Sequence, residues 1–245
     1  MQIQKASDIK TPKRLICFDL DGTLTQHKTP LSEESKAVLD RLGERYKLLM
    51  VGAGNAPRIF NQMQGYPIDI LGNYGMQEAH YVDGELVIVR QDTVIADRDA
   101  FSSRCQYLRE KYGYTEYKGA HLEFHEAGMV TFCLLGSGAD IADKIVFDPD
   151  RSRRRVLYDE VKSLFPEHVV YIGGSSSFDF APKRYNKYDA IMTYAAENGY
   201  GLEEILYVGD DFGDGGGDSH VRIFGMDYVF VDDYRRLPEI LSFLY

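Results

Sequence analysis

Apolar runs separated by polar, helix-forming segments open the chain. Strands are predicted for three of these runs, at residues 14–20, 47–51 and 68–73. Between the first two, Ser32 is placed to cap a helix whose first turn carries Glu33 and Glu34. A further helical segment begins near Pro57. Strands that alternate with helices predict a parallel sheet, with candidate sites at the carboxyl ends of its strands.

The pattern changes from about residue 77, where period-two alternation replaces the helix-and-strand order. Asp83-Gly84 and Ala127-Gly128 lie near the bends of two predicted hairpins, at residues 80–90 and 121–135. A helical stretch at 153–164 and an extended segment at 168–182 complete an antiparallel α+β module. The α/β pattern then resumes with a helix over 187–198, which ends at Gly199, and a strand over 205–209.

The chain therefore predicts an α/β core interrupted by an inserted domain. We expect the core to consist of residues 1–76 and 183–245 and the insertion to consist of residues 77–182. Hinges are expected near Gly75 and Pro182, where the chain passes between the two parts.

Composition and charge narrow the function classes. The chain has 245 residues, of which 44% are hydrophobic and 27% charged, as in soluble globular proteins. A formal net charge of −10 argues against nucleic acid or an anionic membrane as partner. The chain shows neither a bilayer-length apolar run nor a signal-peptide core, and its three cysteines fit neither a disulfide framework nor a zinc site. We expect a cytoplasmic protein in which Cys17 is a buried free thiol.

Two carboxylates end the first predicted strand, where Asp19 and Asp21 stand two residues apart and Gly22 follows. An Asp-Gly turn after a strand is the simple structural explanation for this sequence. Crowded carboxylates are also hard oxygen ligands for magnesium, and one of them can attack phosphorus. The whole string from Phe18 to Thr25 favours the functional interpretation.

A second acidic cluster follows the strand at 205–209. Four aspartates separated by glycines stand here: Asp210, Asp211, Asp214 and Asp218. A solvated loop is one alternative. An EF-hand is another, but Phe212 stands at its third position and no glutamate closes the loop. Because Asp210 also ends a strand, a cation site within reach of Asp19 is the favoured interpretation.

These two strings resemble motifs I and IV of the haloacid-dehalogenase-like phosphotransferases. The segment 173–180 and Lys187 are similar to those of the eukaryotic-type phosphomannomutases, in the C2-capped (type IIB) branch. The resemblance implies a Rossmann-like core with a parallel sheet and an inserted α+β cap with an antiparallel sheet. The cap would close over the site and exclude water.

The resemblance also implies roles for individual residues. Asp19 matches the nucleophile, Asp21 the general acid/base, and Lys187 the cation that neutralises charge in the transition state. The Mg²⁺ site would comprise four residues: Asp19, Asp21, Asp210 and Asp218. Thr23 is expected to orient its loop or to bond the substrate phosphate, or only to form hydrogen bonds with the backbone of the turn. Asp211 and Asp214 depart from the family pattern and are expected to be surface charges.

The second strand departs from the superfamily pattern. A serine or threonine usually follows it and bonds the phosphate, but residues 47–58 contain neither. Asn55 is the expected substitute, through its side-chain amide and the backbone amides around it.

Ser177 and Asp179 match positions that bind sugar hydroxyls in the phosphomannomutases, and strand alternation would put them on one face. A polar strand edge is the structural alternative. In that family cap arginines hold the distal phosphate, but the matching stretch here has no arginine, and Lys118 and His125 are its only cationic candidates. The basic run at 151–155 is interpreted as a solvated helix start, with a phosphate-gripping role as the alternative.

The missing arginines decide between two enzymes. A mutase must hold a sugar phosphate by its distal phosphate, whereas a phosphatase needs one phosphate at Asp19 and a water molecule. We therefore predict an Mg²⁺-dependent phosphatase acting on a small phosphorylated metabolite, with a sugar phosphate as the expected substrate. A phosphomannomutase-like hexose-phosphate mutase and a non-catalytic sugar-phosphate binding protein are the alternatives. Family analogy adds a homodimer through the cap.

Overall fold

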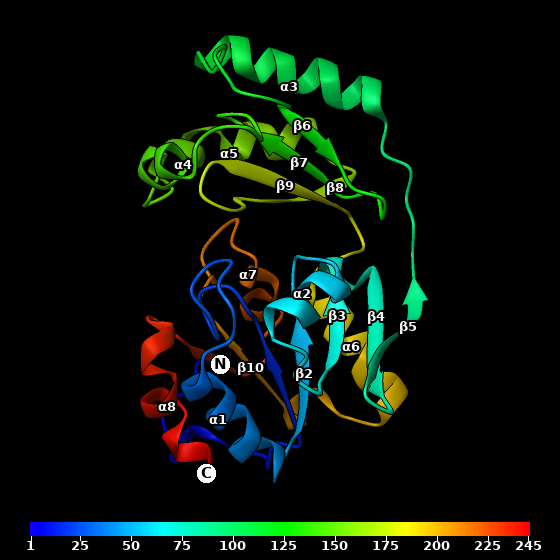
Figure 1. Cartoon of the computed structure of the whole chain (residues 1–245), viewed down its shortest axis with the longest axis vertical. Helices are drawn as coiled ribbons and strands as arrows, with labels where there is room; N and C mark the ends of the chain where they lie inside the picture. Colours follow the sequence, from blue (N-terminus) through cyan, green and yellow to red (C-terminus); the bar gives the residue numbers. More distant parts are fainter. The chain divides into compact units, whose positions relative to one another are not determined.

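The computed structural model describes residues 1–245, which divide into two compact units (Figure 1). The core unit contains Met1–Gln91, Asn186–Asp214 and Asp218–Tyr245. The inserted unit contains Asp92–Tyr185 and Gly215–Gly217. Each unit has its own sheet and its own hydrophobic core.

A seven-stranded sheet forms the centre of the core unit, in the order β11-β10-β1-β2-β3-β4-β5. The first five strands in this order are parallel, and β4 and β5 extend the sheet as an antiparallel hairpin. Its strands are β1 (Leu15–Phe18), β2 (Lys47–Val51), β3 (Asp69–Gly72), β4 (Gln77–Val82), β5 (Glu85–Gln91), β10 (Ile205–Gly209) and β11 (Tyr228–Phe230). The predicted α/β core with a parallel sheet is confirmed.

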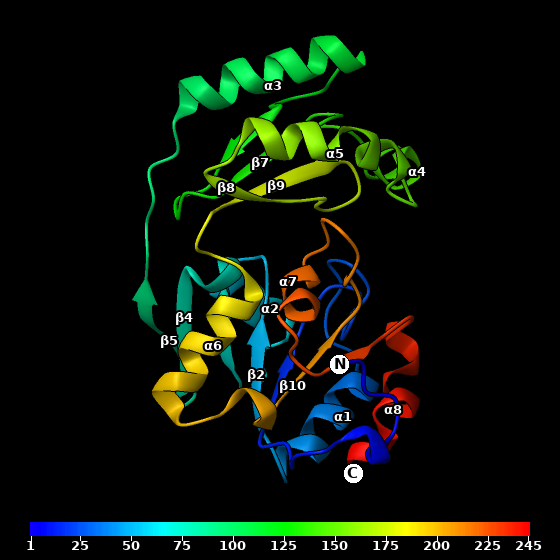
Figure 2. The same ribbon diagram turned by 180° about the vertical axis from the view of Figure 1, so that it is seen from behind.

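Helices cover both faces of this sheet, as the opposite views in Figures 1 and 2 show. They are α1 (Glu33–Gly43), α2 (Ala56–Gln62), α6 (Lys187–Asn198), α7 (Ser219–Ile223) and α8 (Leu237–Ile240). Alternate residues of β1 enter two separate cores: Ile16 and Phe18 pack with α1, α2 and α8, whereas Leu15 and Cys17 pack with α6 and α7. A strand buried on both faces needs an unbroken apolar run, which β1 has.

Local capping signals in the sequence set the ends of the two longest core helices. The Ser32 side chain accepts a hydrogen bond from the Ser35 amide at the start of α1, as predicted. Asn186 caps α6 in the same way through the Asp189 amide, so Lys187 is the first residue of that helix. Gly199 ends α6 with a φ of 71°, in the left-handed region that glycine tolerates best.

The boundary between the units differs from the prediction. The predicted hairpin with Asp83-Gly84 at its turn is present, but β4 pairs with β3 in the core sheet, with Ile70 opposite Ala79. The core unit therefore continues to Gln91 instead of ending at residue 76, and it resumes at Asn186. Period-two alternation marks a hairpin but does not tell which sheet the hairpin joins, because pairing depends on the neighbouring strand.

The inserted unit is an antiparallel α+β module with strand order β6-β7-β9-β8. Its elements are α3 (Arg98–Tyr112), β6 (Leu122–Phe124), β7 (Val130–Cys133), α4 (Ile141–Phe147), α5 (Ser152–Leu164), β8 (His168–Tyr171) and β9 (Ser177–Pro182). Phenylalanines from α3 and the strands fill its core. The sequence analysis identified α5 but not α3, the longest helix of the chain. No helix, α3 included, has the length and apolar character needed to cross a membrane.

The basic run at 151–155 contains one buried arginine, which corrects its interpretation as a wholly solvated helix start. The Arg154 guanidinium is 1% exposed and donates to Asp148 Oδ2 at 2.7 Å. It also donates to the carbonyl oxygens of Gly173, Gly174 and Ser177, at 2.6, 3.0 and 3.1 Å. Arg154 thus ties the start of α5 to the loop that leads into β9.

We expect Arg154→Ala to lower the free energy of unfolding of the inserted unit by about 3–5 kcal/mol, because it leaves Asp148 and three carbonyl groups buried without their donor. Chemical denaturation followed by circular dichroism measures this change. Arg153→Ala, at an exposed position of the same helix, is the matched control and should change stability by less than about 0.5 kcal/mol. Equal effects of the two substitutions would contradict a structural role for Arg154.

Candidate active site

The first and second acidic motifs meet at the carboxyl ends of two neighbouring strands of the core sheet. Asp19 directly follows β1, and its amide donates to the carbonyl oxygen of Val208 in the neighbouring strand β10, at 2.9 Å. Asp210 directly follows β10. Because β1 and β10 are parallel and in register, their carboxyl ends place these two aspartates side by side.

Three aspartates form a cluster that can hold a cation: Asp19, Asp210 and Asp218 each offer a carboxylate oxygen, and these oxygens lie within 4.8 Å of one another. Two glycines make room for them. A Cβ on Gly22, whose φ is +99°, would lie 2.5 Å from Asp210 Oδ2, and one on Gly209 would lie 2.4 Å from Asp218 Oδ2. Side chains at these two positions would displace the carboxylates.

The ammonium group of Lys187 lies inside this cluster. Its Nζ donates to Asp19 Oδ1 at 2.5 Å and to Asp218 Oδ1 at 2.7 Å. Tyr207 on β10 donates its hydroxyl to the same Asp218 oxygen at 2.6 Å. The other Asp218 oxygen accepts from the backbone amides of Asp210 and Asp211, at 3.2 and 3.0 Å. Asp218 is therefore the fixed centre of the cluster, and it is fully buried.

The electrostatics of the cluster favour a further positive charge. Burial raises the pKa of Asp19 to about 6. The charge of Lys187 opposes this shift, and the charge of Asp218 adds to it. Burial and the charges of Asp19 and Asp218 raise the pKa of Asp210 to about 8. Burial opposes the charge on Lys187, but the two aspartates hold its pKa well above the ordinary value. One ammonium for three carboxylates leaves a deficit that a divalent, oxygen-seeking cation would fill.

The carboxylate of Asp21, predicted as both acid/base and metal ligand, lies outside the three-aspartate cluster. Its Oδ1 accepts from the Lys28 amide and from Gln62 Nε2, both at 2.7 Å, and its Oδ2 accepts from an Arg58 Nη at 3.1 Å. Burial alone would raise the pKa of Asp21, but these hydrogen bonds and the nearby His27 and Arg58 lower it below the ordinary value. These partners hold the Asp21 carboxylate against α2.

Thr23 and Asn55 have local structural partners. The Thr23 hydroxyl is fully buried and donates to Asp210 Oδ1 at 3.0 Å, so it orients the acidic cluster. Asn55 caps α2, with its Oδ1 accepting from the Arg58 amide at 2.8 Å. Of the two departing aspartates, Asp214 is exposed and lies 3.3 Å from an Arg222 nitrogen, as expected of surface charge.

In the inserted unit, Ser177 and Asp179 alternate along β9 with the buried Phe178 and Phe180, so they share the sheet face opposite the hydrophobic core. Ser177 donates its hydroxyl to the Gly173 carbonyl at 3.0 Å. Asp179 Oδ1 accepts from the Thr131 hydroxyl, directly opposite on β7, at 2.8 Å.

The polar face of this sheet is acidic. Glu123 lies opposite Thr131 on β6, so two carboxylates flank that threonine across three strands. His125 Nε2 lies 3.1 Å from the Thr131 hydroxyl. The Lys118 ammonium pairs with Asp140 at 2.7 Å. Arg109, buried near the hydrophobic core, donates to the carbonyl oxygens of Tyr114, Cys133 and Leu134.

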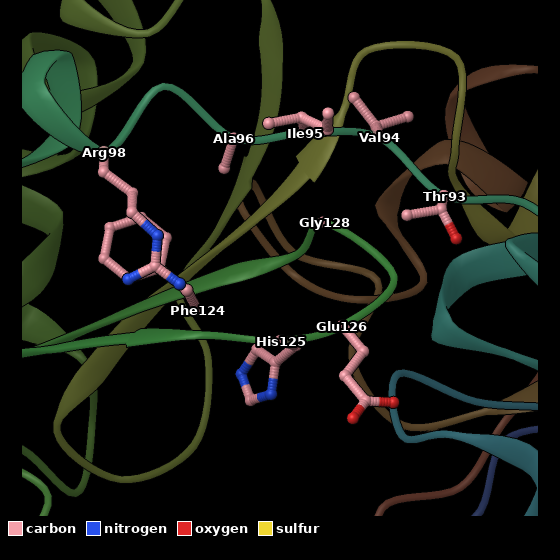
Figure 3. Close-up of a pocket in the computed structure, with 9 residues that line it drawn as sticks. All are labelled: Thr93, Val94, Ile95, Ala96, Arg98, Phe124, His125, Glu126 and Gly128. Atoms are coloured by element: carbon pink, nitrogen blue, oxygen red, sulfur yellow. The ribbon is translucent and has the colours of Figure 1, made fainter.

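A pocket of about 270 Å³ lies in the inserted unit, between the segment 93–96 and the turn 124–128 (Figure 3). The Arg98 guanidinium stacks 4.3 Å from the centre of the Phe124 ring at one end of it. His125 and Glu126 lie along its lower rim in this view. The pocket contains none of the predicted site residues, and through His125 it adjoins the Thr131–Asp179 pair.

Comparison with known proteins agrees with this architecture. No family model matches the chain. The phosphomannomutase of Saccharomyces cerevisiae is 25% identical over 234 residues, with 91% of this chain and 90% of the yeast protein covered. Among solved structures, the IMP-nucleotidase of Plasmodium falciparum matches with a TM-score of 0.67 at 12% identity, covering 96% of this chain and 69% of that chain. A haloacid dehalogenase-like hydrolase of Bacteroides thetaiotaomicron matches with a TM-score of 0.58 at 12% identity, covering 95% and 98%.

The chain has the fold of a haloacid dehalogenase-like hydrolase. Its similarity to phosphomannomutases over nearly its whole length indicates an enzyme of the phosphotransferase type. Within that superfamily its sequence is similar to the phosphomannomutases, and the resemblance noted in the sequence is confirmed.

Sequence reasoning missed the partners of Asp21. Arg58 and Gln62 are spaced i and i+4, so they share one face of α2. That spacing was readable from the sequence, but it does not tell which carboxylate the face meets. The contact depends on the packing of α2 beside the loop after β1, which only the tertiary structure shows.

In cation-free protein, the raised pKa values of Asp19 and Asp210 stabilise the fold below the ordinary pKa of an aspartate, and this contribution is lost as pH rises through about 6 and about 8. We therefore expect the Tm of the wild type, measured with EDTA, to fall relative to that of Asp210→Asn as pH rises from about 5 to about 9. Asp214→Asn, at an exposed site, is the control. Parallel Tm curves for wild type and Asp210→Asn would contradict a raised pKa of Asp210 in the folded protein.

Proposed function

We propose that this protein is an Mg²⁺-dependent phosphatase that hydrolyses a small phosphorylated metabolite, a sugar phosphate, through an aspartyl-phosphate intermediate. The observation that carries the proposal is the buried Lys187 ammonium between Asp19 and Asp218, with Asp210 beside them. Binding alone needs no carboxylate at the point where the phosphate is held. Pairing with Lys187 keeps the Asp19 carboxylate ionised in a buried place, as attack on phosphorus requires.

The cation would be held by Asp19, Asp210 and Asp218, whose hard carboxylate oxygens suit Mg²⁺. When bound, it supplies charge neutralisation for the phosphoryl oxygens. Lys187 adds a second positive charge next to the nucleophile.

In the first step, Asp19 forms a bond to phosphorus while the ester bond to the leaving oxygen breaks, and Asp21 gives that oxygen a proton. In the second step, Asp21 takes a proton from water as the water oxygen bonds to phosphorus and the Asp19–phosphorus bond breaks. Inorganic phosphate leaves, and both aspartates return to their starting states. The hydrogen bonds that lower the pKa of Asp21 keep it ionised, as the second step requires, whereas the first step requires it to give up some of them so that it carries a proton.

The polar sheet face of the inserted unit carries two carboxylates, Glu123 and Asp179, whose chemistry suits the hydroxyl groups of a ligand and not a second phosphate. The buried arginines of this unit, Arg109 and Arg154, are engaged by backbone carbonyl groups and by Asp148. Ser177, Asp179 and, in the core unit, Asn55 remain our candidates for substrate contacts.

A phosphomannomutase-like mutase is the second candidate, because relatives with that name are up to 25% identical over more than 90% of the chain. The two candidates differ in the fate of the phosphoryl group. A mutase returns it to a bisphosphorylated sugar, and a phosphatase gives it to water.

We expect purified protein with Mg²⁺ to release inorganic phosphate from mannose 1-phosphate or glucose 1-phosphate, and EDTA to abolish the release. Phosphorus NMR follows the products with and without a catalytic amount of hexose 1,6-bisphosphate. A hexose 6-phosphate that forms only when the bisphosphate is present would instead establish the mutase.

Asp19→Asn should lower turnover by roughly 10³-fold or more, since an amide is a poor nucleophile toward phosphorus. Circular dichroism should show an unchanged fold, because asparagine has nearly the same shape. Asp214→Asn, an exposed aspartate of the acidic loop, is the matched control and should retain wild-type turnover. Activity of Asp19→Asn close to wild type would exclude the covalent scheme.

A further inference from the structure

The loop after β2 contains no side-chain hydroxyl to bind a phosphate. It comprises residues 52–55, and it follows the strand that pairs in parallel with β1, Met50 lying opposite Phe18. Its backbone is held by the segment after β3, because Gly54 accepts from the Asn73 amide at 2.8 Å and Gly52 accepts from the Tyr74 amide at 3.1 Å. The loop is therefore well placed beside Asp19, and its position is fixed.

The guanidinium of Arg58 lies where a side chain of residue 54 would project. A Cβ built on Gly54 would be 2.4 Å from Arg58 Nε and 3.0 Å from both Cζ and one Nη. The Arg58 amide bonds Asn55 Oδ1, which fixes the first turn of α2 under that side chain. Glycine at position 54 thus leaves space that the guanidinium fills, and a serine or threonine there would compete for the same space.

Arg58 also contacts the first acidic motif, and this contact leaves N–H donors of its guanidinium available for a ligand. One Nη donates to Asp21 Oδ2 at 3.1 Å, so the guanidinium lies beside the carboxylate that follows the nucleophile by two residues. A guanidinium has five N–H donors in a planar fork that matches phosphate oxygens. The Arg58 side chain is 42% exposed, which leaves it open to a ligand.

Asp21 does not depend on Arg58 for its position. Its other oxygen is already bound by the Lys28 amide and by Gln62, both at 2.7 Å. Arg58 is therefore one of three residues that hold this carboxylate, and the contact with Asp21 Oδ2 uses only one of its nitrogens. A second anion beside Asp21 would make full use of the guanidinium fork.

We propose that Arg58, in the first turn of α2, binds the phosphate beside this loop and takes the place of a side-chain hydroxyl at position 54. The inference rests on the proposed function, because that function brings a phosphate to Asp19. Gly54 and Arg58 act as a pair, in which the glycine clears the space and the arginine supplies the donors. Asn55 acts beside them as the residue that caps α2.

The test is a double-mutant cycle of Arg58→Ala and Gly54→Ser. Affinity for inorganic orthophosphate is measured by calorimetry in MgCl₂, and kcat and KM are measured with p-nitrophenyl phosphate. We expect Arg58→Ala to weaken orthophosphate binding and raise KM by about 10- to 100-fold, the range for lost hydrogen bonds to a charged group. Arg58→Lys should recover part of the loss, since it keeps the charge but not the fork.

The second arm of the cycle tests the exchange of arginine for hydroxyl. In the Gly54→Ser background the serine can occupy the space that Arg58→Ala vacates, so the same substitution should cost no more than about threefold. Arg45→Ala, at an exposed position of the core unit, is the matched control and should bind orthophosphate like the wild type.

Three results would overturn the proposal. The first is an Arg58→Ala protein whose affinity for orthophosphate is within about twofold of wild type and whose kcat alone is lowered. That result is expected if Arg58 only positions Asp21. The second is an equal cost of Arg58→Ala in both backgrounds. The third is no orthophosphate binding by the wild type. Binding that depends on Arg58 without hydrolysis of any ester would support Arg58 and refute the phosphatase, so the two failures are distinguishable.

Discussion

The buried ion pairs of Lys187 are the interaction on which the rest of the site depends. The ammonium lies between Asp19 and Asp218, which belong to different elements far apart in the sequence. Without it, three carboxylates, two of them buried, would face one another in a medium that penalises charge. The capping of α6 by Asn186, the contact of Tyr207 with Asp218 and the glycines at 22 and 209 all serve this arrangement.

Charge balance also bears on the phosphate binding that we propose for this acidic chain. The net charge of −10 is unfavourable for anions over the whole molecule, but at the carboxyl ends of the strands Lys187 offsets it, together with the cation that we propose for the three aspartates. Arg58 lies beside the same strand ends, against Asp21. The net charge of the chain therefore does not determine the charge balance around Asp19.

The arginines of the inserted unit show why residue type alone is a weak guide to role. Arg154 belongs to a basic run that looks solvated in the sequence, yet its guanidinium is buried and holds a loop together. Arg109 has a similar role near the carbonyl groups after β7. Both supply hydrogen bonds to buried backbone, which leaves the polar face of the sheet to Glu123, Asp179 and hydroxyl groups.

The sequence by itself determined the α/β core, the insertion, the helix caps at Ser32 and Gly199, and the acidic strand ends at Asp19 and Asp210, because these depend on local periodicity and on turn chemistry. The tertiary structure decided what local patterns do not encode. It assigned the β4–β5 hairpin to the core sheet, buried Arg154, directed Asp21 toward α2 and folded Arg58 over Gly54. Each of these depends on contacts between residues distant in the chain, whose partners are chosen by packing and charge rather than by spacing.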